Sequence, residues 1–399
     1  MKRTLAVDVD AATWRAWRRS VPSELTAGKS SHELDLSRTL LMLGTLTMPQ
    51  LLSRASPARF WAWLRYFLAV SASDDLRITM DFADLDPHQK SILSDDLGVA
   101  VSTFYLYEKF AGIAPIIDGR RFMLQFARLL RRKAKPSKAK VGPSKAPDFV
   151  FRDRSGRWHI LECKGTQSGH GARNHQLKTA LAQKNVIQIT GGIRGERFAS
   201  GLSLGNEDDD FRSELRIVDP DDPHTEPLLT LDETLAEDMD RSAQRISIAR
   251  ALGLIGLNDA AAELALPSDA ASAVELLRPS EVLRVRASVR DRADRATDTI
   301  RRRELVPMEH DHQRYEGRRA QFGYEELGRD AGFSEIAVRQ GVSHDFLQEL
   351  ESAEPMFEDK FDERIRARTE HARIGFESDG SRTILTYGDI LFAELILRT

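Results

Sequence analysis

The chain has 399 residues, of which 41% are hydrophobic and 30% are charged, and its formal net charge is −3. This composition is typical of globular proteins, and the length exceeds what one hydrophobic core usually supports, so we expect two or three domains. The small net charge excludes a general attraction to polyanions, so affinity for nucleic acid would have to come from a local basic patch. The single cysteine, Cys163, excludes an intramolecular disulfide.

Nothing in the sequence predicts export or a membrane span. The first residues become acidic before an apolar core of the signal-peptide kind develops. The most apolar run, 40–52, is interrupted by threonines and by Pro49 and is too short to cross a bilayer. We therefore expect a cytoplasmic protein without a membrane partner. The richness in alanine, arginine and aspartate is typical of bacterial proteins.

The first 90 residues are expected to form a helical N-terminal domain. Tryptophan, phenylalanine and leucine recur there at spacings of three and four residues, in 10–21 and in 57–72, which is typical of a buried helix face. A further helix is predicted over 97–112, with Gly112 as its C-terminal cap. This helix would open a second domain, which we expect to span 91–265.

Residues 131–145 carry seven cations and no acid, together with two prolines. This composition predicts a flexible basic loop rather than a helix. The loop could contact the phosphates of DNA, or it could be a solvated linker. The candidate DNA-binding side chains are Arg131, Arg132, Lys133, Lys135, Lys138, Lys140 and Lys145.

The remaining elements alternate between strand and helix patterns. Two runs rich in β-branched and aromatic residues, 147–153 and 157–165, predict a β-hairpin. They are followed by a predicted helix, two predicted strands and a long predicted helix, over 174–187, 196–205, 213–220 and 231–257. We place a boundary near residue 265 and expect 266–399 to be a mixed α/β domain, because a hairpin is predicted around Asp379 and Gly380.

Charged residues lie inside the predicted hairpin at 147–165, where a buried strand would not tolerate them unpaired. Glu162 and Lys164 are two positions apart, so they project from the same face of a strand, and Asp148 lies across the hairpin. Two close carboxylates repel each other, and a divalent cation is the simplest compensating charge. The alternative is an ordinary hairpin stabilised by salt bridges.

The pair Pro147–Asp148, followed by Glu162, Cys163 and Lys164, resembles the PD-(D/E)xK nuclease superfamily. The resemblance covers about a third of the chain, roughly 95–220, and implies an α+β or α/β fold with a restriction-endonuclease-like central mixed sheet flanked by helices. It implies Asp148 and Glu162 as ligands of Mg²⁺ or Mn²⁺, with the backbone carbonyl of Cys163 completing the metal shell. Lys164 would orient or activate the attacking water.

Two further catalytic positions follow from the resemblance. Many members carry a glutamate on the first helix that faces the metal, and Glu108 is our candidate, although it could equally be an exposed acid at a helix end. Many members also place a glutamine or lysine on the helix after the E-x-K strand. Gln176, Lys178 and Gln183 compete for this role, and we favour Gln183 because of its distance from the catalytic lysine.

The function implied by the resemblance is a metal-dependent endonuclease acting on DNA, and bacterial members often serve restriction, phage defence or DNA repair. One alternative is a non-cleaving subunit that keeps the fold to bind nucleic acid or a partner. Another is an oligomeric effector triggered by a protein partner through its N- or C-terminal domain. The sequence contains no glycine-rich phosphate loop and no dinucleotide fingerprint, so no nucleotide cofactor is expected.

Overall fold

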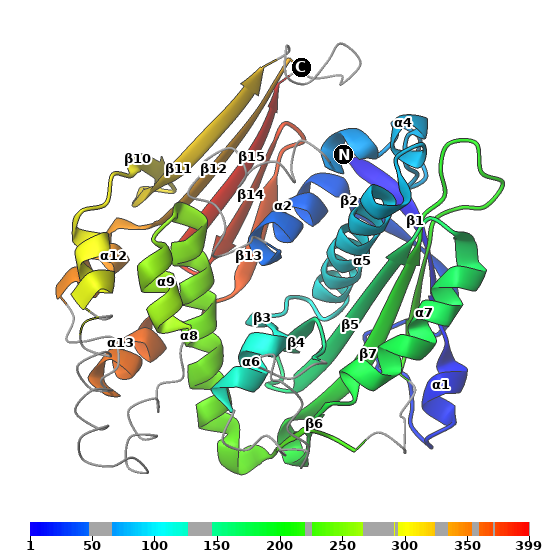
Figure 1. Ribbon diagram of the computed structural model, residues 1–399, viewed down its shortest axis with the longest axis horizontal. Coiled ribbons are helices and arrows are strands. Elements are labelled where there is room, and N and C mark those ends of the chain that lie inside the picture. Colours follow the sequence, from blue (N-terminus) through cyan, green and yellow to red (C-terminus); the bar gives the residue numbers. More distant parts are fainter. Residues whose placement is uncertain are drawn as a thin grey trace. The chain divides into compact units, whose positions relative to one another are not determined.

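The computed structural model describes residues 1–47, 66–126, 146–219, 226–265, 291, 294–323, 334–352, 359–369 and 372–398. These residues form a mixed structure of helices and β-sheets (Figure 1). The chain divides into two compact units. The first contains the described residues up to Thr234 except 124–126, and the second contains 124–126 and the described residues from Leu235 onward.

A seven-stranded mixed sheet, in the order β2-β1-β8-β7-β5-β4-β3, is the centre of the first unit. Its strands are β1 (Lys2–Val9), β2 (Gly28–Asp35), β3 (Ile116–Asp118), β4 (Phe149–Arg152), β5 (Trp158–Thr166), β7 (Arg194–Ser203) and β8 (Glu214–Val218). The pairs β5–β7 and β1–β8 are parallel, and the other neighbours are antiparallel. A separate parallel pair is formed by β6 (Ile187–Ile189) and β9 (Leu229–Leu231).

Two long helices, α5 (Pro87–Lys109) and α7 (Gly169–Lys184), pack against β5 and β7. They cover opposite faces of the sheet. On one face, α5 approaches so closely that a Cβ atom on Gly165 would lie 1.7 Å from the Ser94 carbonyl oxygen. On the other face, Leu177 of α7 packs at Gly201, which is the β7 partner of Lys164. Because successive residues of a strand point to opposite faces, Lys164 projects toward the α7 side.

Shorter elements complete the first unit. They are α1 (Ala11–Arg15), α2 (Leu36–Leu46), α4 (Met80–Ala83), the beginning of α6 (Gly119–Gln125), and the 3₁₀ turns η3 (Gly191–Ile193) and η4 (Glu233–Leu235). The side chain of Asp10 caps α1, and the side chain of Asp35 caps α2. None of the helices within the described residues is both long and apolar enough to cross a bilayer.

The second unit is built on a six-stranded antiparallel sheet in the order β10-β11-β12-β15-β14-β13. Its strands are β10 (Val306–His310), β11 (Gln313–Gly323), β12 (Glu335–Ser343), β13 (Ile374–Ser378), β14 (Arg382–Tyr387) and β15 (Leu391–Arg398). Its helices are α8 (Ala236–Ile255), α9 (Asn258–Leu264), α12 (His344–Ser352) and α13 (Asp359–Thr369). The helix α8 packs against β11 and β12, and Gly256 in the left-handed conformation ends it.

Several predicted elements are confirmed. The hairpin over 147–165 is β4–β5, and the helix and strands that follow it are α7, β7 and β8. The long helix α8 and the hairpin β13–β14 around Asp379 and Gly380 also form as predicted. The helix predicted over 97–112 begins earlier, at Pro87.

The prediction that residues 1–90 are helical is wrong for β1 and β2. In β1, Leu5, Val7 and Val9 are buried and alternate with more exposed residues, which is the two-residue period of a strand. Both strands belong to the same sheet as the β4–β5 hairpin, so residues 1–47 are not a separate helical domain. The two units meet in sequence at Thr234 and Leu235 rather than near 265, because α8 packs on the second sheet.

Candidate active site

The β4–β5 hairpin brings Asp148 opposite Glu162. Phe149 pairs with Leu161, so Asp148, one residue before β4, faces the next position of β5. The backbone N–H of Asp148 donates to Glu162 Oε2 at 3.1 Å, and the backbone N–H of Cys163 donates to Asp148 Oδ2 at 2.7 Å. The predicted pair of carboxylates therefore meets at the point where β4 begins.

Lys164 completes this cluster. Its Nζ forms an ion pair with Glu162 Oε1. The Cys163 side chain is buried, and only its backbone is available to the cluster. In a strand, the N–H and C=O groups of one residue point to the same side, so the Cys163 carbonyl points toward Asp148 as its N–H does. The structure thus brings together the four groups that the sequence singled out.

The cluster holds two acidic side chains and one basic side chain in a buried place. The Glu162 side chain has 0% of its surface exposed, and that of Lys164 has 21%. Burial, together with the charge of Asp148, raises the pKa of Glu162 to about 8. Burial also raises the pKa of Asp148. Although burial opposes it, the charge of Glu162 raises the pKa of Lys164, so this lysine stays protonated.

Two acids that the sequence analysis missed lie close to this cluster. Burial raises the pKa of Asp95 on α5, against the opposing effects of the Lys164 charge and the Gly165 backbone N–H. Asp118, at the end of β3, and Asp95 both contribute to the raised pKa of Asp148. A helix start at Pro87 instead of Leu97 would have included Asp95 among the candidates, since it follows Ser94, which packs against Gly165 of β5.

The structure does not bring Glu108 to the cluster. The Oε2 atom of Glu108 lies 2.8 Å from Nε2 of His32 on β2. Asp95 and Glu108 are 13 positions apart on α5, which corresponds to about 20 Å of helix. Asp95, and not Glu108, is therefore the acid that the first helix places near Asp148.

The candidate residues of α7 lie on both sides of the level of the catalytic cluster. Leu177 lies at the level of Lys164, because it packs at the β7 residue that pairs with Lys164. Gln176 is its neighbour and has a buried Oε1 atom without a hydrogen-bond partner. Gln183 is two turns farther along α7, beside Lys184. Ala180, between them, packs with Ala199, the β7 partner of Glu162, so Gln176 lies one turn before the level of Glu162 and Gln183 one turn after it, and the choice of Gln183 stays a prediction.

The basic loop of 131–145 lies outside the described residues. Its role in DNA binding stays a prediction for all seven cations, which are Arg131, Arg132, Lys133, Lys135, Lys138, Lys140 and Lys145.

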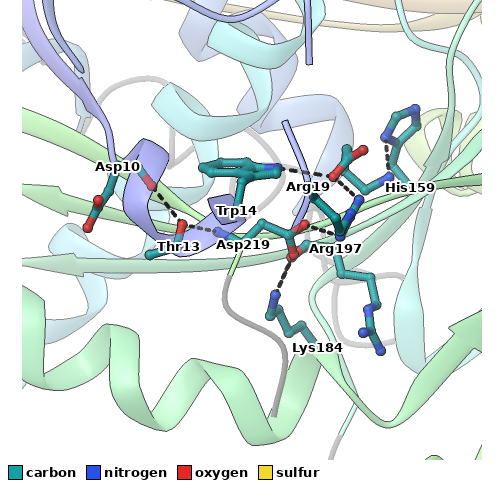
Figure 2. A network of polar contacts seen from close by, with 9 residues as sticks. Asp10, Thr13, Trp14, Arg19, His159, Lys184, Arg197 and Asp219 are labelled. Atoms are coloured by element: carbon teal, nitrogen blue, oxygen red, sulfur yellow. Dashed lines mark hydrogen bonds and ion pairs between the residues drawn. The ribbon is translucent and has the colours of Figure 1, made fainter. Parts of the chain in front are cut away.

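A second polar cluster in the first unit differs from this site because its charges balance (Figure 2). Arg19 pairs with Glu196 and with Asp219, and Lys184 Nζ lies 2.7 Å from Asp219 Oδ1. Trp14 Nε1 donates to Glu196 at 3.2 Å. Although burial opposes it, the charge of Lys184 lowers the pKa of Asp219. Two carboxylates and two cations neutralise each other here, so this network holds the segment after α1 against the sheet and leaves no charge for a metal.

The Asp148 cluster has the chemistry that a hard divalent cation requires. Carboxylate and carbonyl oxygens are the ligands that Mg²⁺ prefers, and the acids near Asp148 outnumber the cation Lys164. Within the described residues, no group of three or more His, Cys, Asp or Glu side chains is arranged to hold a metal ion. The expected ligands are only two side chains, Asp148 and Glu162, together with the backbone carbonyl of Cys163. These oxygen ligands fit a hard divalent cation.

Comparisons of the chain with protein-family models, with curated proteins and with solved structures find no match. The resemblance to the PD-(D/E)xK superfamily therefore depends on residues 147–164 and on the way the fold arranges them.

Proposed function

We propose that this chain is a metal-dependent nuclease that hydrolyses DNA phosphodiester bonds. The observation that carries the proposal is the convergence of Asp148, Glu162 and Lys164 at one point of the sheet, with more carboxylates than cations around them. The order of elements supports it as well. The elements α5, β3, β4, β5, α7 and β7 follow the order of the restriction-endonuclease-like core, with α6 inserted after β3.

In this proposal each residue has a distinct role. A divalent cation held by Asp148, Glu162 and the Cys163 carbonyl would supply Lewis-acid polarisation of the phosphodiester. Glu162 has no exposed surface, which suits a ligand rather than a base that exchanges protons with bulk water. The partly exposed ammonium of Lys164 can reach a phosphate that approaches from solvent. Its positive charge would stabilise the negative charge that develops on the phosphate oxygens in the transition state.

The test is an incubation of the protein with plasmid, linear duplex and single-stranded DNA, in Mg²⁺, Mn²⁺ or EDTA. We expect cleavage with either cation and none in EDTA. Lys164→Ala should lower the cleavage rate by about 10²–10³ while DNA binding and the melting temperature stay close to wild type. Lys29→Ala removes an exposed lysine of β2 and is the matched control.

Two outcomes would contradict the proposal. Binding of DNA without cleavage by the wild type, under all cation conditions, would favour a non-cleaving subunit with the same fold. Cleavage that Lys164→Ala leaves unchanged would show that the chemistry takes place elsewhere on the chain.

A further inference from the structure

A pocket with a volume of about 140 Å³ lies beside the candidate active site. It opens where the parallel strands β5 and β7 end, since Gln167 follows β5 and Leu204 follows β7. The carboxyl ends of parallel strands are the usual place for ligands in α/β sheets. The residues after β5 and β7 form two sides of the pocket. Lys90 of α5 and Ile78, in the segment before α5, form another side. We call this the β5–β7 pocket.

The β5–β7 pocket is close to the acids and the lysine of the active site along two elements. Gln167 follows Lys164 by three residues, which is roughly 10 Å of extended chain. Lys90 precedes Asp95 by five residues of α5, or about 7.5 Å. The Lys164 side chain projects toward the α7 side and Lys90 lines the pocket from the α5 side, so a bound strand would pass the open ends of β5 and β7. A nucleic-acid strand advances roughly 3.4 Å per nucleotide, so the roughly 10 Å of chain between Lys164 and Gln167 corresponds to about three nucleotides.

The polar groups of the β5–β7 pocket include unused donors and an acceptor. The amide nitrogen of Gln167 is buried without a hydrogen-bond partner. Lys90 makes no ion pair with any described residue. Asp209 accepts from the backbone N–H of Asn206 through Oδ2 at 2.8 Å, and no described residue donates to its Oδ1. A ligand that satisfies these groups must therefore have both acceptors and donors.

The rest of the wall combines the apolar Ile78, Ala83 and Leu204 with the polar Ser168 and Asn206. Ile78 and Leu204 are buried core residues that form part of the lining. A phosphate group does not match this environment, because it has only acceptors and would face the carboxylate of Asp209. A nucleobase has a flat apolar face and a polar edge, and the volume is close to that of one purine. Pockets for drug-sized ligands are larger, roughly 300–1,000 Å³.

Among the bases, guanine matches the groups best. Its O6 and N7 atoms accept hydrogen bonds, which suits Lys90 and the Gln167 amide nitrogen, and its N2 amino group donates, which suits Asp209. On the edge that carries N7, guanine has two adjacent acceptors, whereas adenine has one acceptor beside an amino donor. Cytosine is a smaller base with a single ring. We propose that the β5–β7 pocket binds one unpaired guanine of the nucleic-acid substrate, within about three nucleotides of the cleaved bond. The inference rests on the proposed nuclease function for its biological meaning, but the binding itself does not require cleavage.

The first test measures binding without catalysis. Titration calorimetry and thermal melting in EDTA would compare guanosine monophosphate, adenosine monophosphate and inorganic phosphate. We expect guanosine monophosphate to bind at least about tenfold more tightly than the other two, and Asp209→Asn to remove this difference. Gln167→Ala should weaken guanosine monophosphate alone. Asp208→Asn, which changes an exposed acid of the same loop, is the matched control and should behave as wild type.

The second test measures where single-stranded oligonucleotides with one guanine are cut. We expect cuts within about three nucleotides of the guanine, at positions that follow it when it is moved, and we expect Asp209→Asn to lose this preference. Equal binding of the two nucleotides, or binding of inorganic phosphate as tight as that of guanosine monophosphate, would overturn the inference. Neither result would affect a cleavage activity that depends on Lys164. Conversely, the protein could bind guanosine monophosphate selectively and still not cleave DNA. That result would contradict the nuclease proposal and support the assignment of the pocket.

Discussion

Replacing Glu162 by glutamine should stabilise the metal-free protein at high pH. Burial, with the charge of Asp148, raises the pKa of Glu162 to about 8, from an ordinary value of 4.5. Between these pH values the folded protein holds a proton that the unfolded chain has released, so the free energy of unfolding falls as the pH rises. At roughly 1.4 kcal/mol per pH unit, the whole interval corresponds to an upper limit of about 5 kcal/mol.

Glutamine cannot ionise, so the Glu162→Gln protein does not undergo this loss. We expect it to exceed the wild type in unfolding free energy by a few kcal/mol (roughly 2–5) at pH 8.5 in EDTA, and by almost nothing at pH 5. Urea denaturation followed by circular dichroism at several pH values measures the difference. Excess Mn²⁺ should restore the wild type at pH 8.5 and stabilise Glu162→Gln much less, because the variant has lost one of the two carboxylate ligands.

Asp153→Asn provides a control of opposite sign in the same hairpin. Although burial opposes it, a hydrogen bond with His159 lowers the pKa of Asp153. Its contribution to stability is therefore present at neutral pH and is lost only as the pH falls through its lowered pKa. We expect Asp153→Asn to be less stable than wild type throughout pH 5–8.5. If the unfolding free energies of wild type and Glu162→Gln depend on pH in the same way, the idea that burial destabilises the ionised Glu162 is refuted.

Three further changes separate the parts of the site. Asp95→Asn should alter the cation dependence of cleavage at least severalfold, whereas Glu108→Gln should not, as activity assays over a Mg²⁺ titration would show; the reverse result would restore Glu108 to the site. Gly165→Ala should destabilise the protein by about 3 kcal/mol or more in urea denaturation, because the new Cβ atom would meet the Ser94 carbonyl oxygen. The control is Gly171→Ala on α7, whose Cβ atom would meet no atom within 4 Å and should not destabilise the protein. Replacing Lys135, Lys138, Lys140 and Lys145 by serine should reduce the slope of log affinity against log salt by about 0.9 for each duplex phosphate that the loop no longer neutralises, and an unchanged slope would make 131–145 a linker.

The parts of the site that the sequence predicted are those determined by short-range patterns. Two β-rich runs joined by a turn place Asp148 opposite Glu162 through local pairing alone, and the two-residue period places Lys164 beside Glu162. Asp95 and Asp118 come from other elements and reach the cluster only through the packing of α5 and β3. No spacing in the sequence encodes that packing.

The error in residues 1–90 has a similar origin. The pattern of β1 is a good strand pattern, but α1 separates it from its partner β2, and its other partner β8 is distant in sequence, so no hairpin signal marks this sheet. On α7, a count of residues from Lys164 favours Gln183, but Gln176 and Gln183 lie on either side of the level of Glu162, so the choice stays a prediction. The direction of a helix after a strand is a property of the fold that residue counting does not capture.

The parallel pairing of β1 with β8 also constrains how the chain can fold during its synthesis. Ala6 pairs with Glu214, so 208 residues separate the two partners. At roughly 5–20 residues per second, β1 waits about 10–40 s for β8 after it leaves the ribosome. During that time one edge of β1 has no strand beside it, and such edges pair readily with other chains. The first unit therefore completes its sheet only after almost all of its sequence has been made, and until then the open edge of β1 is exposed to pairing with other chains.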